Sequence, residues 1–446
     1  MTLHRIYKAG LSALSLSRWR NRLILWSGAI VVGIVAAGYA QIADLAQQGF
    51  ADFVAYNPLL PLVVSPLVFA IAAWLTHQYC PGAVGSGIPQ AIAARNLHEP
   101  EQRRFLLGGQ IITGKILFTS MGLLAGASLG REGPTVQLGA AILYLGAKLG
   151  KVNEEMARSI ILAGAAAGVA AAFNTPLAGI VFAIEEMARE FEHRYSGVVL
   201  TAIVLAGASS LSILGNYTYF GIADGHFAIG RDWPAILVIG VLGGLLGGVF
   251  SRALTEGGPR LLAVCKGWNL DHPAYLAALC GLVIAGIGIA THGATYGSGY
   301  DQAKAMLDGH SDGSWSFTLG KFLATIISGF SGLPGGIFSP SLSVGAGLGA
   351  SMAPLFSVTP AAGAVLLGMT AYFAGVTQAP ITSFIIVLEV TGRLSLPVPL
   401  LAVAVIAAGM SRLVCPTSLY HALAKGFIDL IRHQSPAVKD PAVQLE

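Results

Sequence analysis

Charged residues are scarce in this chain of 446 residues. Asp, Glu, Lys and Arg make up 11% of the sequence, hydrophobic residues make up 54%, and the mean hydropathy is +0.69. Soluble domains carry about 25% charged residues, so the composition excludes an ordinary soluble protein. A membrane-crossing helix needs about 20 mostly apolar residues, and five long runs hold no charged residue: residues 23–43, 53–94, 195–223, 272–300 and 322–388. The chain is therefore predicted to be an all-α polytopic protein of the lipid bilayer.

The longest of these runs, residues 322–388, is too long for one or two helices. It must turn inside or at the membrane without charged residues to mark the turns. Its glycines and prolines favour broken or re-entrant helices, which are tolerated only where protein buries them or where they line a cavity.

Several kinds of chemical site are missing from the sequence. No CxxC pair, HExxH motif or GxxxxGK[ST] loop is present, and the four cysteines are scattered: Cys80, Cys265, Cys280 and Cys415. We therefore expect free thiols, no metal site, no phosphate-binding loop and no cofactor. An intramembrane hydrolase would need a nucleophile with a partner base, and no His, Cys or Asp is placed for that role, so no enzymatic activity is expected.

Basic residues gather at the two ends of the chain: His4, Arg5, Lys8, Arg18, Arg20 and Arg22, then Lys425, Arg432 and Lys439. By the positive-inside rule both termini are predicted to be cytoplasmic, with an even number of crossings. Residues 1–20 form the predicted N-terminal segment and residues 426–446 a short tail. The net charge of +4 gives no reason to expect a nucleic-acid partner.

The chain contains an internal repeat. Three patterns recur in the same order, from residue 85 to 297, from 130 to 336 and from 176 to 380, at offsets of 212, 206 and 204: GSGIPQAIA and GSGYDQAKA, GREGPTVQLGA and GIFSPSLSVGA, PLAGIVFAIE and PITSFIIVLE. We predict two homologous halves, residues 21–215 and 216–425. Such repeats are typical of transporters, which bind substrate at the repeat interface near the midplane. The pattern leaves open whether the halves are inverted.

Two glutamates break the symmetry of the repeat. Glu132 aligns with Phe338, and Glu186 aligns with Val390. A packing requirement would tend to appear in both halves, and an ionisable residue within a membrane is by default a functional candidate. We therefore interpret Glu132 and Glu186 as residues that carry chemistry.

The segments GSGIP, GREGP and GGIFSP each place glycine shortly before proline at the start of an apolar stretch. Glycine permits a tight turn and proline fits the first turn of a helix, so each segment predicts a helix N-terminus. Three such N-termini facing one point inside the membrane would bind an anion weakly through backbone N–H groups and helix dipoles. Glu132 lies in the second segment. Ionised, it can occupy the anion site; protonated, it leaves and the anion enters.

Alternatives remain for each charged residue. Glu132 can instead pair with Arg131, although neighbours in sequence point in different directions along a helix. Arg131 stays charged and needs a carbonyl or carboxylate partner. Lys115 either adds a positive field for the anion or neutralises a buried carboxylate.

The segment FAIEEMAREFEHR, residues 182–194, has two interpretations. As a whole it is the charged end of a helix that reaches water, with Glu190, Glu192, His193 and Arg194 at the surface. Glu186, one step further inside, is a candidate proton entry point, and Glu185 can pair with Arg189 at the (i, i+4) spacing.

At these residues the sequence resembles the CLC family of chloride channels and transporters. Residues 85–89, 130–134 and 336–340 match its three signature segments, and Tyr420 in CPTSLYHALAK matches the family's late tyrosine. The match runs from about residue 20 to residue 425. The resemblance implies a homodimer with one pathway per subunit, each subunit holding two inverted halves.

The resemblance also implies the role of each site residue. Glu132 would be the external gate and Glu186 the internal proton glutamate of the exchangers. Bound chloride, the substrate, would be held by the Ser86 and Tyr420 hydroxyls and by the amides of Ile337 and Phe338. The same signature segments supply the remaining candidate anion-binding residues: Gly87, Ile88, Arg131 and Gly133.

A proton-coupled chloride antiporter is the function that the resemblance favours, and a passive chloride-selective channel of the same fold is the alternative. Passive members usually lack an acid at the Glu186 position, and serine at position 86 resembles the chloride-selective members. The tail after residue 425 is too short for the paired cytoplasmic domains of eukaryotic members. The expected location is therefore the inner membrane of a prokaryote.

Overall fold

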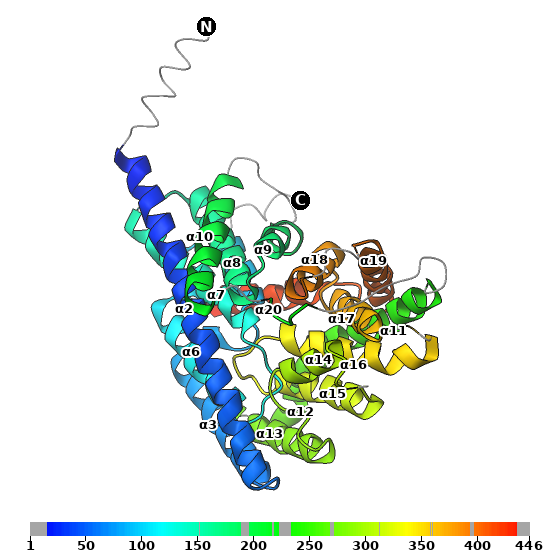
Figure 1. The fold of residues 1–446 in the computed structure, drawn as a ribbon. Helices are drawn as coiled ribbons and strands as arrows, with labels where there is room; N and C mark the ends of the chain where they lie inside the picture. The colour runs from blue at the N-terminus through cyan, green and yellow to red at the C-terminus, as the bar shows by residue number, and fades with distance from the viewer. Residues whose placement is uncertain are drawn as a thin grey trace, which may run out of the picture.

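A computed structural model describes residues 16–150, 152–188, 196–215, 218–222, 233–267, 272–311, 313–356, 358, 360–392 and 397–434. Most of these residues are helical, and the described part of the chain holds two isolated β-bridges and no longer strand pairing (Figure 1). Eight of the described helices are long and apolar enough to cross a membrane. The predicted all-α polytopic fold is confirmed.

The first half contains α2 (Leu16–Tyr56), α3 (Pro61–Tyr79), α4 (Ile88–Asn96), α5 (Pro100–Leu107), α6 (Gly109–Leu123), α7 (Glu132–Gly150), α8 (Glu154–Phe173), α9 (Pro176–Phe182), the π-helical turn η2 (Ala183–Ala188) and α10 (Ser196–Leu214). The second half contains α11 (Trp233–Arg252), α12 (Gly258–Gly267), α13 (Pro273–Ala290), α14 (Tyr300–Leu307), α15 (Trp315–Phe330), α16 (Phe338–Phe356), α17 (Ala362–Thr377), α18 (Pro380–Val390) and α19 (Pro397–Val414), and α20 (Leu419–Gln434) follows. The helices α4, α9, α14 and α18 are too short to cross a bilayer, which confirms the predicted broken helices.

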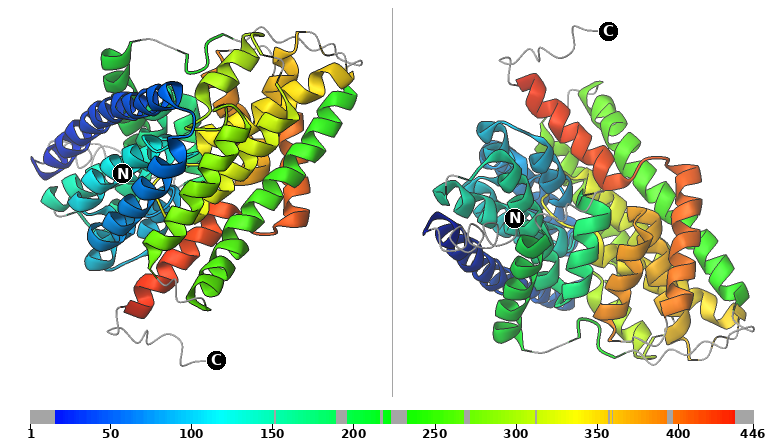
Figure 2. Two further views of the ribbon diagram at one scale, coloured as in Figure 1. Left: turned by 90° about the horizontal axis from the view of Figure 1, so that it is seen from below. Right: turned by 90° about the horizontal axis from the view of Figure 1, so that it is seen from above.

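The two halves begin their helices at matching positions. α3 and α13 begin at Pro61 and Pro273, and α7 and α16 begin at Glu132 and Phe338, so each pair of helices keeps the spacing of the sequence repeat. Most of the blue-to-green helices of the first half lie on one side of the molecule, and the yellow and orange helices of the second half lie on the other (Figure 2).

A reciprocal contact at the centre joins equivalent residues of the two halves. The Gly130 amide donates to the Gly336 carbonyl oxygen and the Gly336 amide donates to that of Gly130, both at 2.7 Å, in an antiparallel bridge. These two glycines are equivalent in the repeat. Because equivalent residues pair with their chains running in opposite directions, a local two-fold axis relates the halves.

A second reciprocal contact joins the short helices α9 and α18. The Glu185 carboxylate accepts hydrogen bonds from the Ile381 and Thr382 amides, at 3.1 and 2.6 Å, at the start of α18. The Glu389 carboxylate accepts from the Leu177 and Ala178 amides at the start of α9, also at 3.1 and 2.6 Å. Each glutamate therefore satisfies orphan N–H groups of the other half's helix.

Some predictions fall on residues outside the described ranges. The proposed partner of Glu185, Arg189, lies there, as do the four residues predicted at the surface: Glu190, Glu192, His193 and Arg194. The predicted cytoplasmic ends lie partly outside, and the boundary between the halves falls beside residues 216–217, which are also outside.

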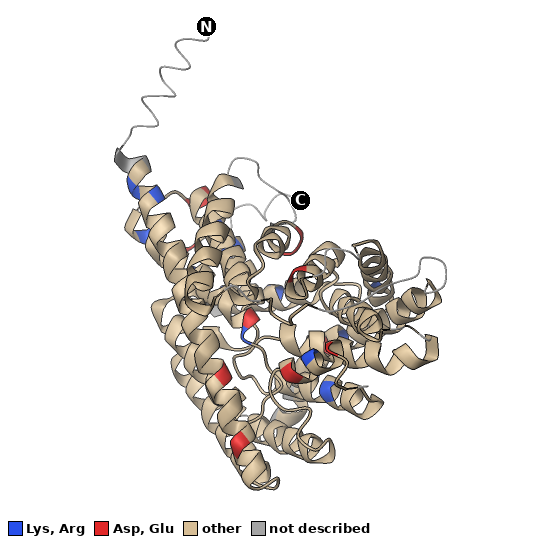
Figure 3. Ribbon diagram, in the orientation of Figure 1, with Lys and Arg blue, Asp and Glu red and all other residues tan. Residues whose placement is uncertain are grey.

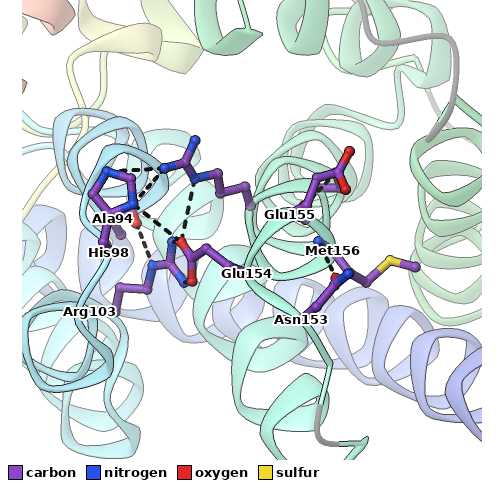
Figure 4. Close-up of polar contacts among 9 residues, drawn as sticks. Ala94, His98, Arg103, Asn153, Glu154, Glu155 and Met156 are labelled. Carbon is purple, nitrogen blue, oxygen red and sulfur yellow. Dashed lines mark hydrogen bonds and ion pairs between the residues drawn. The ribbon is translucent and has the colours of Figure 1, made fainter.

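Charged side chains are sparse along the helices (Figure 3). One cluster ties the C-terminal end of α4 to α5 and α8 (Figure 4). Arg103, only 2% exposed, pairs with Glu154 at the start of α8, and its Nε donates to the Ala94 carbonyl oxygen at 3.0 Å. The cluster orients α4, whose other end carries the first signature segment.

Candidate functional site

The three signature segments lie in close contact where α4, α7 and α16 begin. A Cβ atom placed on Gly133 would lie 2.6 Å from the Ser86 Oγ and 3.1 Å from the Gly336 Cα, and one placed on Gly87 would lie 2.6 Å from the Gly133 carbonyl oxygen. Gly87 also has φ +110°, which favours glycine. The three helix starts approach this closely because these positions carry no side chains. Their positive dipole ends converge, as an anion site requires.

Two hydroxyl groups border this point. Ser86 Oγ and Tyr420 Oη are buried and have no hydrogen-bond partner among the described residues. The Tyr420 ring stacks on Phe338, the first residue of α16, with centroids 6.2 Å apart and planes 15° apart. Ile88 and Ile337 are buried beside them in the helix starts. Since buried polar groups are nearly always hydrogen-bonded, two unpartnered hydroxyls at converging helix N-termini are placed to donate to an anion.

Glu132 is the first residue of α7 and is 1% exposed. Its Oε1 atom accepts hydrogen bonds from the Tyr219 hydroxyl at 2.8 Å and from the Ser339 hydroxyl at 2.9 Å. Its Oε2 atom is buried without a hydrogen-bond partner among the described residues, and it faces Gly130 so closely that a side chain there would collide with it.

Arg131 has the carboxylate and carbonyl partners that its burial demands. Its guanidinium lies 2.6 Å from Asp44 and donates to the Ala40 carbonyl oxygen at 2.8 Å, both on α2. Because Arg131 pairs with Asp44, the alternative in which it neutralises Glu132 loses its support.

A cavity of about 450 Å³ is lined in part by Glu132. We call it the vestibule, and its polar walls include Asp44, Gln47, Arg131, Glu132, Tyr219 and Asp301. Glu132, which is almost fully buried, forms part of its lining. The vestibule therefore reaches the start of α7.

Glu186 lies on the π-helical turn η2 that continues α9. Its side chain is 5% exposed, and its Oε1 lies 3.6 Å from Nδ1 of His421, whose side chain is 23% exposed. His421 follows Tyr420 on α20. The structure thus brings Glu186 beside a residue that reaches solvent and that adjoins Tyr420.

Lys115 binds backbone carbonyl groups. Its Nζ donates to the carbonyl oxygens of Ala83 and Gly85, at 2.8 and 2.6 Å, in the loop just before Ser86. Its counterpart in the second half, Lys321, donates to two carbonyl oxygens in the equivalent loop. Of the two alternatives left open for Lys115, neutralisation of a buried carboxylate finds no support, because backbone carbonyl groups receive its hydrogen bonds.

Sequence reasoning missed the partners of the two glutamates. Ser339 lies inside the third signature segment, where its hydroxyl was a visible signal. Tyr219 and His421 gave none, because each contact joins residues that are far apart in the sequence.

Comparison with known proteins agrees with the geometry. A family profile described as voltage gated chloride channel matches residues 68–412. The chain is 31% identical over 396 residues to the H(+)/Cl(-) exchange transporter ClcA of Vibrio parahaemolyticus, covering 82% of this chain and 79% of that protein. It is 30% identical over 434 residues to the protein of the same name from Vibrio cholerae, covering 88% and 86%.

A solved structure has the same fold. The crystal structure of a slow cyanobacterial Cl−/H+ antiporter superposes with a TM-score of 0.79 at 25% identity, covering 92% of this chain and 98% of that one. The profile spans more than half of the chain, and the relatives match over most of their length. The chain therefore belongs to the voltage-gated chloride channel family.

Proposed function

We propose that this protein is a proton-coupled chloride antiporter. One observation carries the proposal: a buried carboxylate, Glu132, stands at the point where three helix N-termini and two unpartnered hydroxyls converge. The relatives that cover most of the chain are named as exchangers of chloride and protons, which supports the same reading. Transport of two ions without a chemical conversion fits this site.

The coupling follows from the chemistry of Glu132. The ionised carboxylate is itself an anion, so it competes with chloride for the positive ends of α4, α7 and α16. Protonation removes that charge, which lets the side chain leave and chloride enter. Chloride would be held by the hydroxyls of Ser86 and Tyr420 and by the amides of Ile337 and Phe338. The backbone of Gly87, Ile88 and Gly133 shapes the site, and Arg131 adds positive charge on the vestibule side.

Glu186 would supply protons from the cytoplasmic side. It is buried, but His421 beside it is partly exposed. A proton can therefore reach Glu186 without passing along the chloride path. The acid at this position is the observation that favours exchange over a passive channel.

We further propose a homodimer with one pathway per subunit, located in the inner membrane of a prokaryote with both termini cytoplasmic. The resemblance supports the dimer, and the basic chain ends support the orientation. In that orientation the vestibule faces outward, because it lies along the second half of α2.

Reversal potentials in liposomes test the function. Under a chloride gradient with an added pH gradient, the voltage should move with pH and fall short of the chloride equilibrium value. Glu132→Gln should leave chloride flux and abolish proton pumping. A wild-type voltage fixed by chloride alone would establish the passive channel instead, and a mutant that still pumps protons would refute the role of Glu132.

A further inference from the structure

Tyr219 lies on the segment that connects α10 to α11, between the two halves. Its ring is buried against Phe173 and Phe220, with centroids 5.2 and 5.0 Å away. The Tyr300 hydroxyl donates to the Tyr219 carbonyl oxygen at 2.6 Å, and the Phe220 amide donates to the Val390 carbonyl oxygen at 2.8 Å. Ring packing and these backbone hydrogen bonds fix the position of the Tyr219 side chain.

The Tyr219 and Ser339 hydroxyls, which we call the hydroxyl pair, both reach one oxygen of Glu132. They lie 2.8 and 2.9 Å from Oε1 and 3.0 Å from each other. A hydroxyl has one hydrogen to donate. With both hydrogens directed at Oε1, the pair matches an oxygen that only accepts, as in the ionised carboxylate.

Protonation of Glu132 would loosen this hold. Oε2 has no hydrogen-bond partner among the described residues, so it can take the proton while Oε1 keeps its two donors. Oε1 then becomes a neutral carbonyl oxygen. Hydrogen bonds to a charged acceptor are roughly twice as strong as those to a neutral one. The pair therefore holds the ionised side chain more tightly than the protonated one.

We propose that the hydroxyl pair holds ionised Glu132 in its blocking position and so sets how readily the gate opens. Tyr219 and Ser339 are positioning residues, since they act through Glu132. The inference rests on the proposed function, in which Glu132 must leave its place for chloride to pass.

Other charged and titratable groups surround Glu132. Arg131 is paired with Asp44, the tyrosines Tyr39 and Tyr420 interact with Glu132 electrostatically, and Asp301 lines the vestibule. The two variants below leave all of these groups in place, so a change in pH dependence reports the loss of a donor to Oε1.

The test measures chloride and proton flux in liposomes for Tyr219→Phe and Ser339→Ala. Each variant removes one donor to the charged oxygen and keeps the surrounding packing. Chloride flux at neutral pH should rise by about tenfold, the factor that corresponds to the free energy of one hydrogen bond to a charged group. The pH of half-maximal flux should rise by about one unit, because the ionised form loses support. The proton-to-chloride ratio should not change.

A matched control and a second background make the test specific. Tyr372→Phe removes a buried phenol hydroxyl packed between Phe250 and Phe322, and it should leave flux and pH profile unchanged. In a Glu132→Ala background, Tyr219→Phe should have no effect, since the acceptor is gone.

Two results would overturn the inference: unchanged flux and pH profile in both single variants, or an equal effect of Tyr219→Phe with and without the Glu132 carboxylate. If Tyr219→Phe folds poorly, Ser339→Ala measures the same hold on Oε1. Failure of the proposed function would be seen separately, as a wild-type reversal potential that does not change with pH. The chloride-flux comparison between the variants could still be made in that case.

Discussion

Replacing Lys115 with methionine should damage the anion site through the loop that carries Ser86. The lysine is fully buried, and its Nζ holds the carbonyl oxygens of Ala83 and Gly85. Methionine keeps the apolar stem but donates nothing. The Gly85 oxygen retains a bond from the Gly335 amide at 3.0 Å, whereas Ala83 loses the only hydrogen bond that its oxygen accepts among the described residues. A buried orphan carbonyl costs about 1–3 kcal/mol, so the free energy of unfolding should fall by about 2 kcal/mol.

Lys321 provides the matched control. Its Nζ donates to the carbonyl oxygens of Thr295 and Gly297, at 3.1 and 2.6 Å, in the equivalent loop of the second half. Lys321→Met should lower stability by a similar amount. That loop leads to Ser298, which lines the vestibule rather than the convergence of helix starts. Chloride affinity should therefore be nearly unchanged in this variant.

The two variants separate the effect on the anion site from the effect on folding. Thermal unfolding in detergent gives the stability change, and calorimetric titration with chloride gives the affinity. Lys115→Met disturbs the loop that holds the Ser86 hydroxyl in place, and the loss of one such hydrogen bond, worth about 1 kcal/mol, should weaken chloride binding about fivefold. Lys321→Met should not weaken it. Equal losses of affinity in both variants would refute the reasoning, as would full stability in Lys115→Met.

Two further predictions concern the glutamates and their partners. His421→Gln removes the titratable neighbour of Glu186, so proton and chloride flux should fall severalfold together when this is the only substitution. When the same substitution is made in the uncoupled Glu132→Gln variant, chloride flux should not change. A loss of chloride flux in that double variant would contradict the proton role of His421. Glu389→Gln and Glu185→Gln each weaken an N-terminal cap and should cost about 1 kcal/mol of stability, measured by thermal unfolding, and a loss confined to one of them would contradict the reciprocal arrangement.

The sequence predicted the fold because its signals are local or repeated. Apolar runs give membrane helices, and the glycine-then-proline segments give the starts of α4, α7 and α16. The repeat offset aligned Glu132 with Phe338 and so marked Glu132 as exceptional. Each of these inferences needs only residues close together in the chain or a comparison of the two halves.

The contacts of the key residues could not be predicted from the sequence, because tertiary packing alone brings the partners together, even where one of them, Ser339, lies in a signature segment. The Tyr219 contact with Glu132 spans 87 residues, and the Ser339 contact spans 207. Lys115 shows the same limit. A lysine in an apolar stretch suggests an electrostatic role, but its partners are backbone carbonyl groups of the loop between α3 and α4, which composition does not reveal.

The repeat itself separates structural residues from candidates for transport. Residues that occur in both halves make hydrogen bonds that hold the fold: Gly130 with Gly336, Lys115 and Lys321 with their loops, Glu185 and Glu389 with the opposite short helices. Glu132 and Glu186 have no equivalent in the second half, and both are buried carboxylates. Each has a partner outside the repeat pattern, Tyr219 for Glu132 and His421 for Glu186. A two-fold scaffold has no direction of its own. Under the proposed function, proton and anion enter the path through different groups at its two ends, and these two glutamates would supply that difference.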